Sequence, residues 1–153
     1  MAASNKRVRK AVTPRGKIIP SNNDPDKFYT EHPSWRFSSC DNEMWSLLSL
    51  DSQKLFWEEI FPRLKDLETQ KWSDILVDAK KQNHSIEIQK LNKIAVDRLS
   101  DLFIEIDSIV SIRLTGKHRI YGFITGSVFN ILWVDLNHGD NSNCICRSKK
   151  RHT

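Results

Sequence analysis

Near the C-terminal end of the chain, apolar and polar side chains follow the two-residue period of β-strands. Residues 109–114 alternate in this way, and strand side chains point to opposite faces in turn, so we expect a half-buried strand there. Residues 118–125 predict a second strand, and residues 128–135, rich in β-branched and aromatic side chains, predict a third. Gly116 and Gly126 mark the connecting turns, because glycine tolerates positive φ. Three strands joined this way make an antiparallel meander.

Ahead of the strands the apolar spacing is helical. Apolar residues recur three and four positions apart after Asp51 and again after Ser73, two residue types that cap helix N-termini. Pro62 is expected to break or kink the first helix, because proline has no N–H to donate. A third helix has its apolar residues on one face: Leu91, Ile94, Ala95, Leu99, Leu102 and Phe103. The sequence therefore predicts an α+β fold with helices followed by a C-terminal antiparallel sheet of three or more strands.

The length of 153 residues indicates one domain with terminal extensions. Residues 1–24 contain prolines and few large apolar side chains, which predicts a disordered basic arm. Residues 25–146 are expected to form the single α+β domain, with residues 25–70 as an accessory segment and residues 71–140 as its core. Residues 147–153 form a basic tail.

Aromatic side chains are interleaved with polar ones between residues 28 and 45, where a short strand at residues 35–38 is possible. The rings of Tyr29, Trp35, Phe37 and Trp45 could stack on nucleic-acid bases, or they could anchor an irregular segment to the core. The sequence leaves both interpretations open.

The formal net charge of +5 is unevenly distributed along the chain. Residues 1–23 carry six basic and no acidic residues, and residues 147–153 carry four basic ones, whereas residues 24–146 contain 14 basic and 19 acidic residues. Basic ends of this kind can hold phosphate backbones through counterion release. The expected nucleic-acid contacts in the arm are Lys6, Arg7, Arg9 and Lys10. The alternative is that both ends only keep the protein soluble.

The cysteines and the hydropathy indicate a cytoplasmic protein. Cys40, Cys144 and Cys146 form an odd, unevenly spaced set, which argues against a disulfide framework. No apolar run approaches the ~18 residues that span a membrane, and no apolar stretch follows the basic N-terminus, so we expect no membrane partner. Zinc could be held by Cys144 and Cys146 with His138 and His152, but a Cys-x-Cys pair is tight for a tetrahedral site. We therefore expect no metal or other cofactor.

Candidate chemical groups gather in the predicted strands. Arg113, Lys117, Arg119 and Tyr121 fall within nine residues, and His138 follows the third strand. Arg119 and Tyr121 are two positions apart in one strand, so their side chains share a face. The alternative is that these are exposed charges that keep the sheet soluble and protect its edges. The chain has no glycine-rich phosphate loop, Gly-x-Ser-x-Gly elbow or His-Glu-x-x-His pair.

The stretch SIRLTGKHRIYGFITGSVFNILWVDLNH resembles the RelE/ParE superfamily of bacterial toxins, and within it the YoeB-like mRNA interferases. The resemblance rests on a strand ending in Arg-Leu-Thr, a short polar turn, His-Arg-Ile, a hairpin, an apolar strand and a terminal His. It covers about thirty residues. It implies a small domain whose twisted antiparallel sheet packs helices on one side and receives substrate on the other.

The resemblance also implies a reaction, in which the RNA 2′-hydroxyl attacks the adjacent phosphate inside a ribosome. By motif position, Arg119 corresponds to the family's phosphate-binding arginine and His138 to its terminal acid or base. Substrate contacts are expected from Arg113, Lys117 and Tyr121. YoeB-like members place a carboxylate base before the first of these strands, where this chain has Glu105 and Asp107, neither of which matches by motif position.

Three classes of function are open from the sequence. The leading hypothesis is a metal-independent endoribonuclease of a toxin–antitoxin system, a hydrolase whose partners are RNA or the ribosome and an antitoxin protein. The alternative is a non-catalytic factor of a phage or mobile element that binds nucleic acid or protein. A third is an interaction module whose acidic body meets a basic partner.

Overall fold

The computed structural model describes residues 25–139 and 145–146. The predicted arm and tail lie outside these residues, as do Cys144, His152 and the four expected nucleic-acid contacts Lys6, Arg7, Arg9 and Lys10. None of the helices in the described part of the chain has the length and apolar character needed to span a bilayer.

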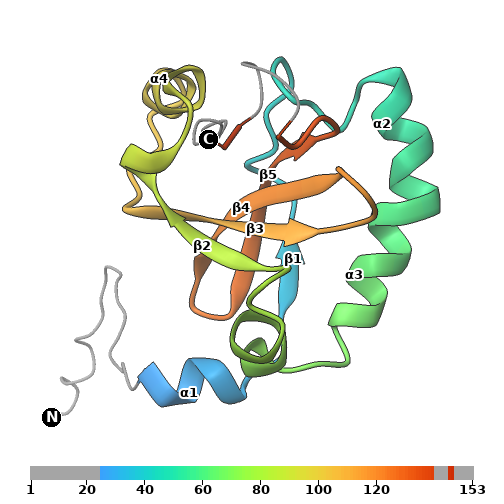
Figure 1. Ribbon diagram of the computed structural model, residues 1–153, viewed down its shortest axis with the longest axis vertical. Helices are drawn as coiled ribbons and strands as arrows, with labels where there is room; N and C mark the ends of the chain where they lie inside the picture. The colour runs from blue at the N-terminus through green and yellow to red at the C-terminus, as the bar shows by residue number, and fades with distance from the viewer. Residues whose placement is uncertain (1–24, 140–144, 147–153) are drawn as a thin grey trace, which may run out of the picture.

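A five-stranded sheet in the order β1-β5-β4-β3-β2 forms the centre of the protein (Figure 1). Its strands are β1 (Ser34–Arg36), β2 (His84–Glu87), β3 (Ser108–Arg113), β4 (Arg119–Thr125) and β5 (Val128–Asp135). The predicted meander is confirmed, because β3, β4 and β5 pair antiparallel in sequence order. The predicted antiparallel sheet needs one correction: β2 adds to β3 antiparallel, but β1 pairs with β5 in parallel, so the sheet is mixed.

Every helical element in the described part of the chain precedes the meander. They are α1 (Pro25–Thr30), α2 (Leu50–Leu55), the π turn η2 (Phe56–Ile60), α3 (Phe61–Leu67), the π turn η3 (Asp74–Asp78), the 3₁₀ turn η4 (Ile88–Lys90) and α4 (Lys93–Asp101). α2, η2 and α3 follow one another without a gap. Pro62 does not break this run. The Phe61 N–H donates to the Phe56 carbonyl five residues back, and we attribute this wider turn to the proline ring, which would clash in a regular α-helix.

The other two predicted helices are confirmed in part. Ser73 makes no capping side-chain bond, and the helix after it is only the π turn η3. α4 begins after Asn92, whose Oδ1 accepts the Ile94 N–H at 3.0 Å. Most of its predicted apolar stripe packs inward, but Phe103 is 91% exposed at a positive φ of 58° just beyond the helix.

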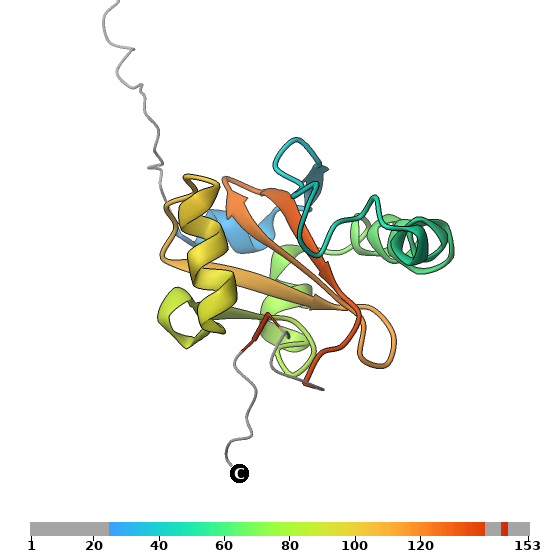
Figure 2. The same ribbon diagram turned by 90° about the horizontal axis from the view of Figure 1, so that it is seen from above.

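Helical segments cover both faces of the sheet (Figure 2). On one face, Ile60 and Leu64 of the α2–α3 run pack in a core with Ile112, Ile120 and Trp72. On the other face, Ala95 and Leu99 of α4 pack in a second core. Tyr121, Leu132 and Trp133 belong to this second core. The face that the resemblance leaves open for substrate is therefore covered in its central part by α4.

The aromatic residues between positions 28 and 45 mainly anchor that segment to the two cores. The ring of Trp35 lies 5.8 Å from that of Phe129, and the ring of Trp45 lies 4.9 Å from that of Trp133, in edge-to-face contacts. Tyr29 and Phe37 are more exposed, at 39% and 44%. For the two tryptophans, the contacts favour the anchoring interpretation over base stacking.

A β-bulge fixes how β5 meets β4. Trp133 is opposite Tyr121 and Ile131 is opposite Gly122, so Leu132 is an extra residue. A Cβ atom at Gly122 would overlap the carbonyl oxygen of Asn130, so only glycine fits this close approach of the two strands. The extra residue Leu132 packs beside Trp133 in the core under α4. The bulge directly follows the residue pair formed by Tyr121 and Trp133.

Candidate functional site

Two rows of side chains meet on the α4 face, at the end of the sheet where β2 and β4 begin and β3 ends (Figure 1). Directly opposed residues form the first row: His84, Ser111, Tyr121 and Trp133. The second row is one step nearer the end of the sheet: Arg113, Arg119 and Asp135. Residues two apart in a strand share a face, so both rows lie on the same side. We call His84, Arg113, Arg119, Tyr121 and His138 the cationic cluster.

The β3–β4 turn holds Arg119 in place. The Leu114 N–H donates to the His118 carbonyl at 2.9 Å, and Gly116 takes the positive φ of 51° that the turn requires. Nη1 of Arg119 donates to the carbonyls of Gly116 at 2.7 Å and His118 at 3.0 Å. Backbone bonds of this kind fix the guanidinium over the turn without removing its charge.

The same turn is tied to the helical layer by Glu59 of η2. The Glu59 carboxylate accepts the Thr115 hydroxyl at 2.6 Å and contacts Nδ1 of His118 at 3.0 Å. Burial alone would raise the pKa of Glu59, but the bonds from Thr115 and His118 and the charge of His118 hold it below its ordinary value. Glu59 is therefore an anchor for the turn that carries Arg119.

His138 reaches the cluster from the segment after β5. Its backbone N–H donates to the Lys117 carbonyl at 3.2 Å, which brings it back over the β3–β4 turn. Its Nδ1 lies 3.4 Å from the hydroxyl of the fully buried Tyr121 and 3.4 Å from the sulfur of Cys146. Both contacts are on the Nδ1 side of the imidazole, and Nε2 is on the opposite side of the ring.

Residues 145–146 close the cluster against α4. The Ile145 N–H donates to the buried carboxylate of Asp135 at 3.3 Å, and its carbonyl accepts the Asn92 N–H at 3.0 Å. Cys146 forms a β-bridge with Leu91. The chain thus returns across the sheet end and places the Cys146 thiol beside His138.

Positive charge is concentrated here. Arg113 and Arg119 are direct partners across β3 and β4, and within residues 25–139 and 145–146 neither forms an ion pair with a carboxylate. Burial lowers the pKa of Arg119 and the charge of Arg113 lowers it further, while Asp135 acts in the opposite sense. Like charges held this close favour the binding of an anion.

His84 shares this electrostatic environment. Partial burial of this largely exposed residue lowers its pKa first, and the electrostatic effects of His138 and Arg119 add to it, against a hydrogen bond to the Lys80 backbone. An imidazole in such surroundings stays neutral to lower pH than an isolated one. Sequence patterns did not point to His84, because it opens a four-residue strand without apolar alternation.

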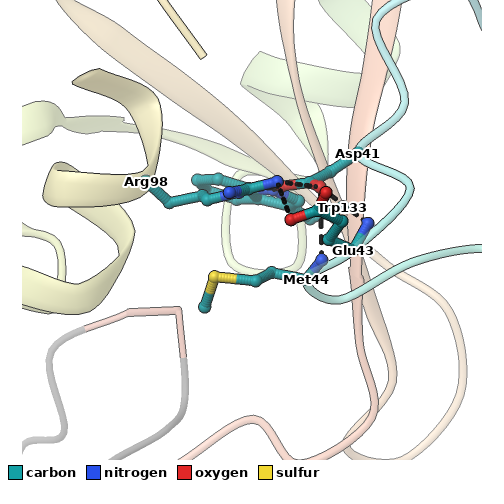
Figure 3. A network of polar contacts seen from close by, with 5 residues as sticks. All are labelled: Asp41, Glu43, Met44, Arg98 and Trp133. Atoms are coloured by element: carbon teal, nitrogen blue, oxygen red, sulfur yellow. Dashed lines mark hydrogen bonds and ion pairs between the residues drawn. The ribbon is translucent and has the colours of Figure 1, made fainter. Parts of the chain in front are cut away.

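A second polar network lies on the same face, beside α4 (Figure 3). The buried Asp41 accepts Nε of Arg98 at 2.7 Å, Nη2 of Arg98 at 2.8 Å and Nε1 of Trp133 at 3.0 Å. It also accepts the backbone N–H groups of Glu43 at 2.9 Å and Met44 at 3.2 Å. Burial would raise the pKa of Asp41, but these bonds hold it far below its usual range. This network joins the 37–49 loop to α4 and is not part of the cationic cluster.

A cavity of about 490 Å³ lies elsewhere, between that loop and the α2–η2 segment. Its lining is mainly apolar and includes Phe37, Leu48, Phe56 and Trp57. Burial raises the pKa of the Cys40 thiol in its wall to about 11, which makes this cysteine a poor nucleophile at neutral pH. Among the described residues that line this cavity there is no histidine, lysine or arginine, unlike in the cationic cluster.

The structure brings together most of the site residues that were predicted from the strand region. Arg113, Arg119, Tyr121 and His138 come together in the cationic cluster. Lys117 is exposed in the adjoining turn and contributes its carbonyl to His138. Among the described residues, no group of three or more His, Cys, Asp or Glu side chains is arranged to hold a metal ion.

No protein-family model, curated protein or solved structure matches the chain. Its function is therefore inferred from its own residues.

Proposed function

We propose that this protein is a toxin-type RNA endonuclease, an mRNA interferase that acts on ribosome-bound RNA with its own side chains as the catalytic groups. One observation carries the proposal: two neighbouring arginines, a histidine and a tyrosine from three separate segments converge at one end of the sheet. These groups can supply two needs of RNA cleavage by the neighbouring 2′-hydroxyl, namely cations for the phosphate and an acid for the leaving 5′-oxygen. The RelE/ParE-like motif of the sequence points to the same reaction.

The arginines suit the phosphate. A guanidinium presents its donors in a planar fork that matches two phosphate oxygens. Arg113 and Arg119 repel each other in the absence of a ligand, so a bound phosphate relieves that repulsion. In the transition state the phosphate gains charge, and fixed cations stabilise it more than the ground state. Arg119, held over the turn by two carbonyls, is the better fixed of the two.

His138 suits the proton transfer. As the 2′-oxygen bonds to phosphorus, the bond from phosphorus to the 5′-oxygen breaks and its electron pair goes to that oxygen. A proton from His138 completes the 5′-hydroxyl, and the other product is a 2′,3′-cyclic phosphate. Tyr121, fixed in the core, contacts Nδ1 and orients the ring so that Nε2 is the nitrogen that exchanges the proton.

The test is primer extension on mRNA from a reconstituted translation reaction with wild-type protein, Arg119→Ala and His138→Ala. We expect cuts at defined positions with wild type, a loss of about 10²–10³-fold for Arg119→Ala and of about 10²–10⁴-fold for His138→Ala. Matched controls are Arg36→Ala and His32→Ala, two exposed residues outside the cluster, which should cut like wild type.

Other outcomes would contradict the proposal. Intact mRNA with every protein would exclude RNA cleavage. Salt-sensitive RNA binding without any cut would indicate the non-catalytic binding factor instead. Cleavage that survives both cluster substitutions would move the active site elsewhere in the chain.

A further inference from the structure

The reaction proposed above also needs a group that removes the proton of the 2′-hydroxyl. The two carboxylates that precede the meander, Glu105 and Asp107, are at the wrong end of the sheet. Asp107 is just before the first residue of β3, whereas Arg113 is its last residue. Six residues of extended strand span about 20 Å, at roughly 3.3 Å per residue. Neither carboxylate is therefore a member of the cationic cluster.

His84 is at the correct end. It is the first residue of β2 and lies directly opposite Ser111, which in turn lies opposite Tyr121. Two strand spacings place its backbone about 10 Å from that of Tyr121. His138 lies on the other side of Tyr121, whose hydroxyl its Nδ1 contacts. Two imidazoles thus flank the arginines from β2 on one side and from the segment after β5 on the other.

The charges around His84 favour a proton acceptor. His138 and Arg119 face it from other elements, Arg113 is in the adjacent row on β3, and the Lys80 backbone bonds to its ring. Partial burial lowers its pKa, and the electrostatic effects of His138 and Arg119 act in the same direction. A neutral imidazole carries a lone pair that can accept a proton, so His84 is suited to act as a base.

We propose that His84 is the general base of the RNA cleavage reaction and His138 its general acid. The inference rests on the proposed function, because it assigns the second proton transfer of that reaction. The 2′-hydroxyl gives its proton to the His84 imidazole as its oxygen bonds to phosphorus, and His138 gives a proton to the departing 5′-oxygen. Solvent then returns both histidines to their starting states, so protons balance over one turnover.

The test separates acid from base by changing the leaving group. The mRNA carries one sulfur in place of the bridging 5′-oxygen at the position that wild type cuts. A thiolate leaves without protonation, so the sulfur substrate does not need the acid. We expect His138→Ala to recover to within about 10-fold of wild type on this substrate. His84→Ala, which lacks the base, should remain about 10²–10⁴-fold slower on both substrates.

A pH profile gives a second readout. Wild-type cleavage of the sulfur substrate should fall at acidic pH as His84 takes up a proton, and His84→Ala should lose this acidic limb. His32→Ala is the matched control, since His32 is an exposed histidine bonded to the Gln70 carbonyl, outside the cluster. Because His84 is exposed, its variant should fold, which circular dichroism can verify.

The failures are distinguishable. A wild-type protein that cuts neither substrate overturns the proposed function and this assignment with it. A wild-type protein that cuts, with a His84→Ala variant equally active on the oxygen substrate, overturns only the role of His84. Recovery of His84→Ala rather than His138→Ala on the sulfur substrate would reverse the two roles and contradict the assignment.

Discussion

Two polar clusters share the α4 face of the sheet and differ in how their charges are balanced. Asp41 is buried and accepts five hydrogen bonds, two of them from the Arg98 guanidinium (Figure 3). The cationic cluster instead places Arg113 and Arg119 side by side, with His84 and His138 beside them. The charge of Asp41 is balanced by Arg98, whereas the cationic cluster carries an excess of positive charge.

The difference indicates different roles. A buried carboxylate with all its partners stabilises the fold and has little left to offer a ligand. Neighbouring cations destabilise the fold slightly, and proteins tend to keep such arrangements where a ligand of opposite charge binds. The same face of the sheet thus carries a structural cluster and a candidate binding cluster, which meet at the neighbouring residues Trp133 and Tyr121.

The largest effect is expected for Asp41→Ala. It removes the buried carboxylate that accepts two bonds from the Arg98 guanidinium, which is 15% exposed, and leaves it the contact with the exposed Glu43 at 3.4 Å, so the free energy of unfolding should fall by about 3–5 kcal/mol. Urea denaturation measures this, with the milder Asp41→Asn as a second variant. Asp97→Ala is the control, because Asp97 pairs with Lys93 on the exposed side of the same helix, and should cost about 0.5 kcal/mol. Equal losses for the two positions would mean that the buried network is not stabilising.

Acid should weaken the same network. The pKa of Asp41 is lowered in the folded protein, so its contribution is fully present above the ordinary aspartate pKa of about 3.9 and is lost as pH falls toward the lowered value. The free energy of unfolding should therefore fall below about pH 4 more steeply in wild type than in Asp41→Asn. Glu59, whose pKa is also lowered, contributes in the same direction in both proteins and cancels in the comparison. Parallel pH curves would contradict the assignment.

The meander could be predicted from the sequence because its signal is local. Alternation, β-branched residues and turn glycines all lie within each strand and its neighbour. β2 has only four residues and little apolar alternation, so its pairing with β3 is decided by tertiary contacts. The π turn before Pro62 could not be predicted either, because the proline indicates only that a regular α-helix is interrupted and not which geometry replaces it.

The part of the candidate site that depends on local strand geometry could also be predicted from the sequence. Arg119 and Tyr121 share a face by the period of the strand, which needs no tertiary information. The partner of Arg113 depends on the register of the β3–β4 hairpin, and the structure opposes it directly to Arg119. His84 and Cys146 come from segments with no periodic signal, so only the folded chain brings them to His138.

A smaller effect is expected at the anchor of the β3–β4 turn. Glu59→Gln weakens the bonds to Thr115 and His118 and should lower the free energy of unfolding by about 1 kcal/mol. Because that turn carries Arg119, the proposed RNA cleavage should fall as well, but less than in Arg119→Ala. Glu58→Gln changes the exposed neighbouring residue and should leave both quantities unchanged. A Glu59 variant with full stability would show that the turn does not depend on this anchor.

The smallest effect on stability is expected for Arg119→Ala. The variant loses two bonds to turn carbonyls but also the repulsion from Arg113, so its free energy of unfolding should stay within about 0.5 kcal/mol of wild type. Inorganic phosphate, compared with chloride at equal ionic strength, should raise the Tm of wild type and not of the variant, because an anion that binds the folded state stabilises it. Thermal unfolding measures both. A loss above about 2 kcal/mol without any phosphate effect would mean that Arg119, like Arg98, serves the fold, and the contrast between the two clusters would disappear.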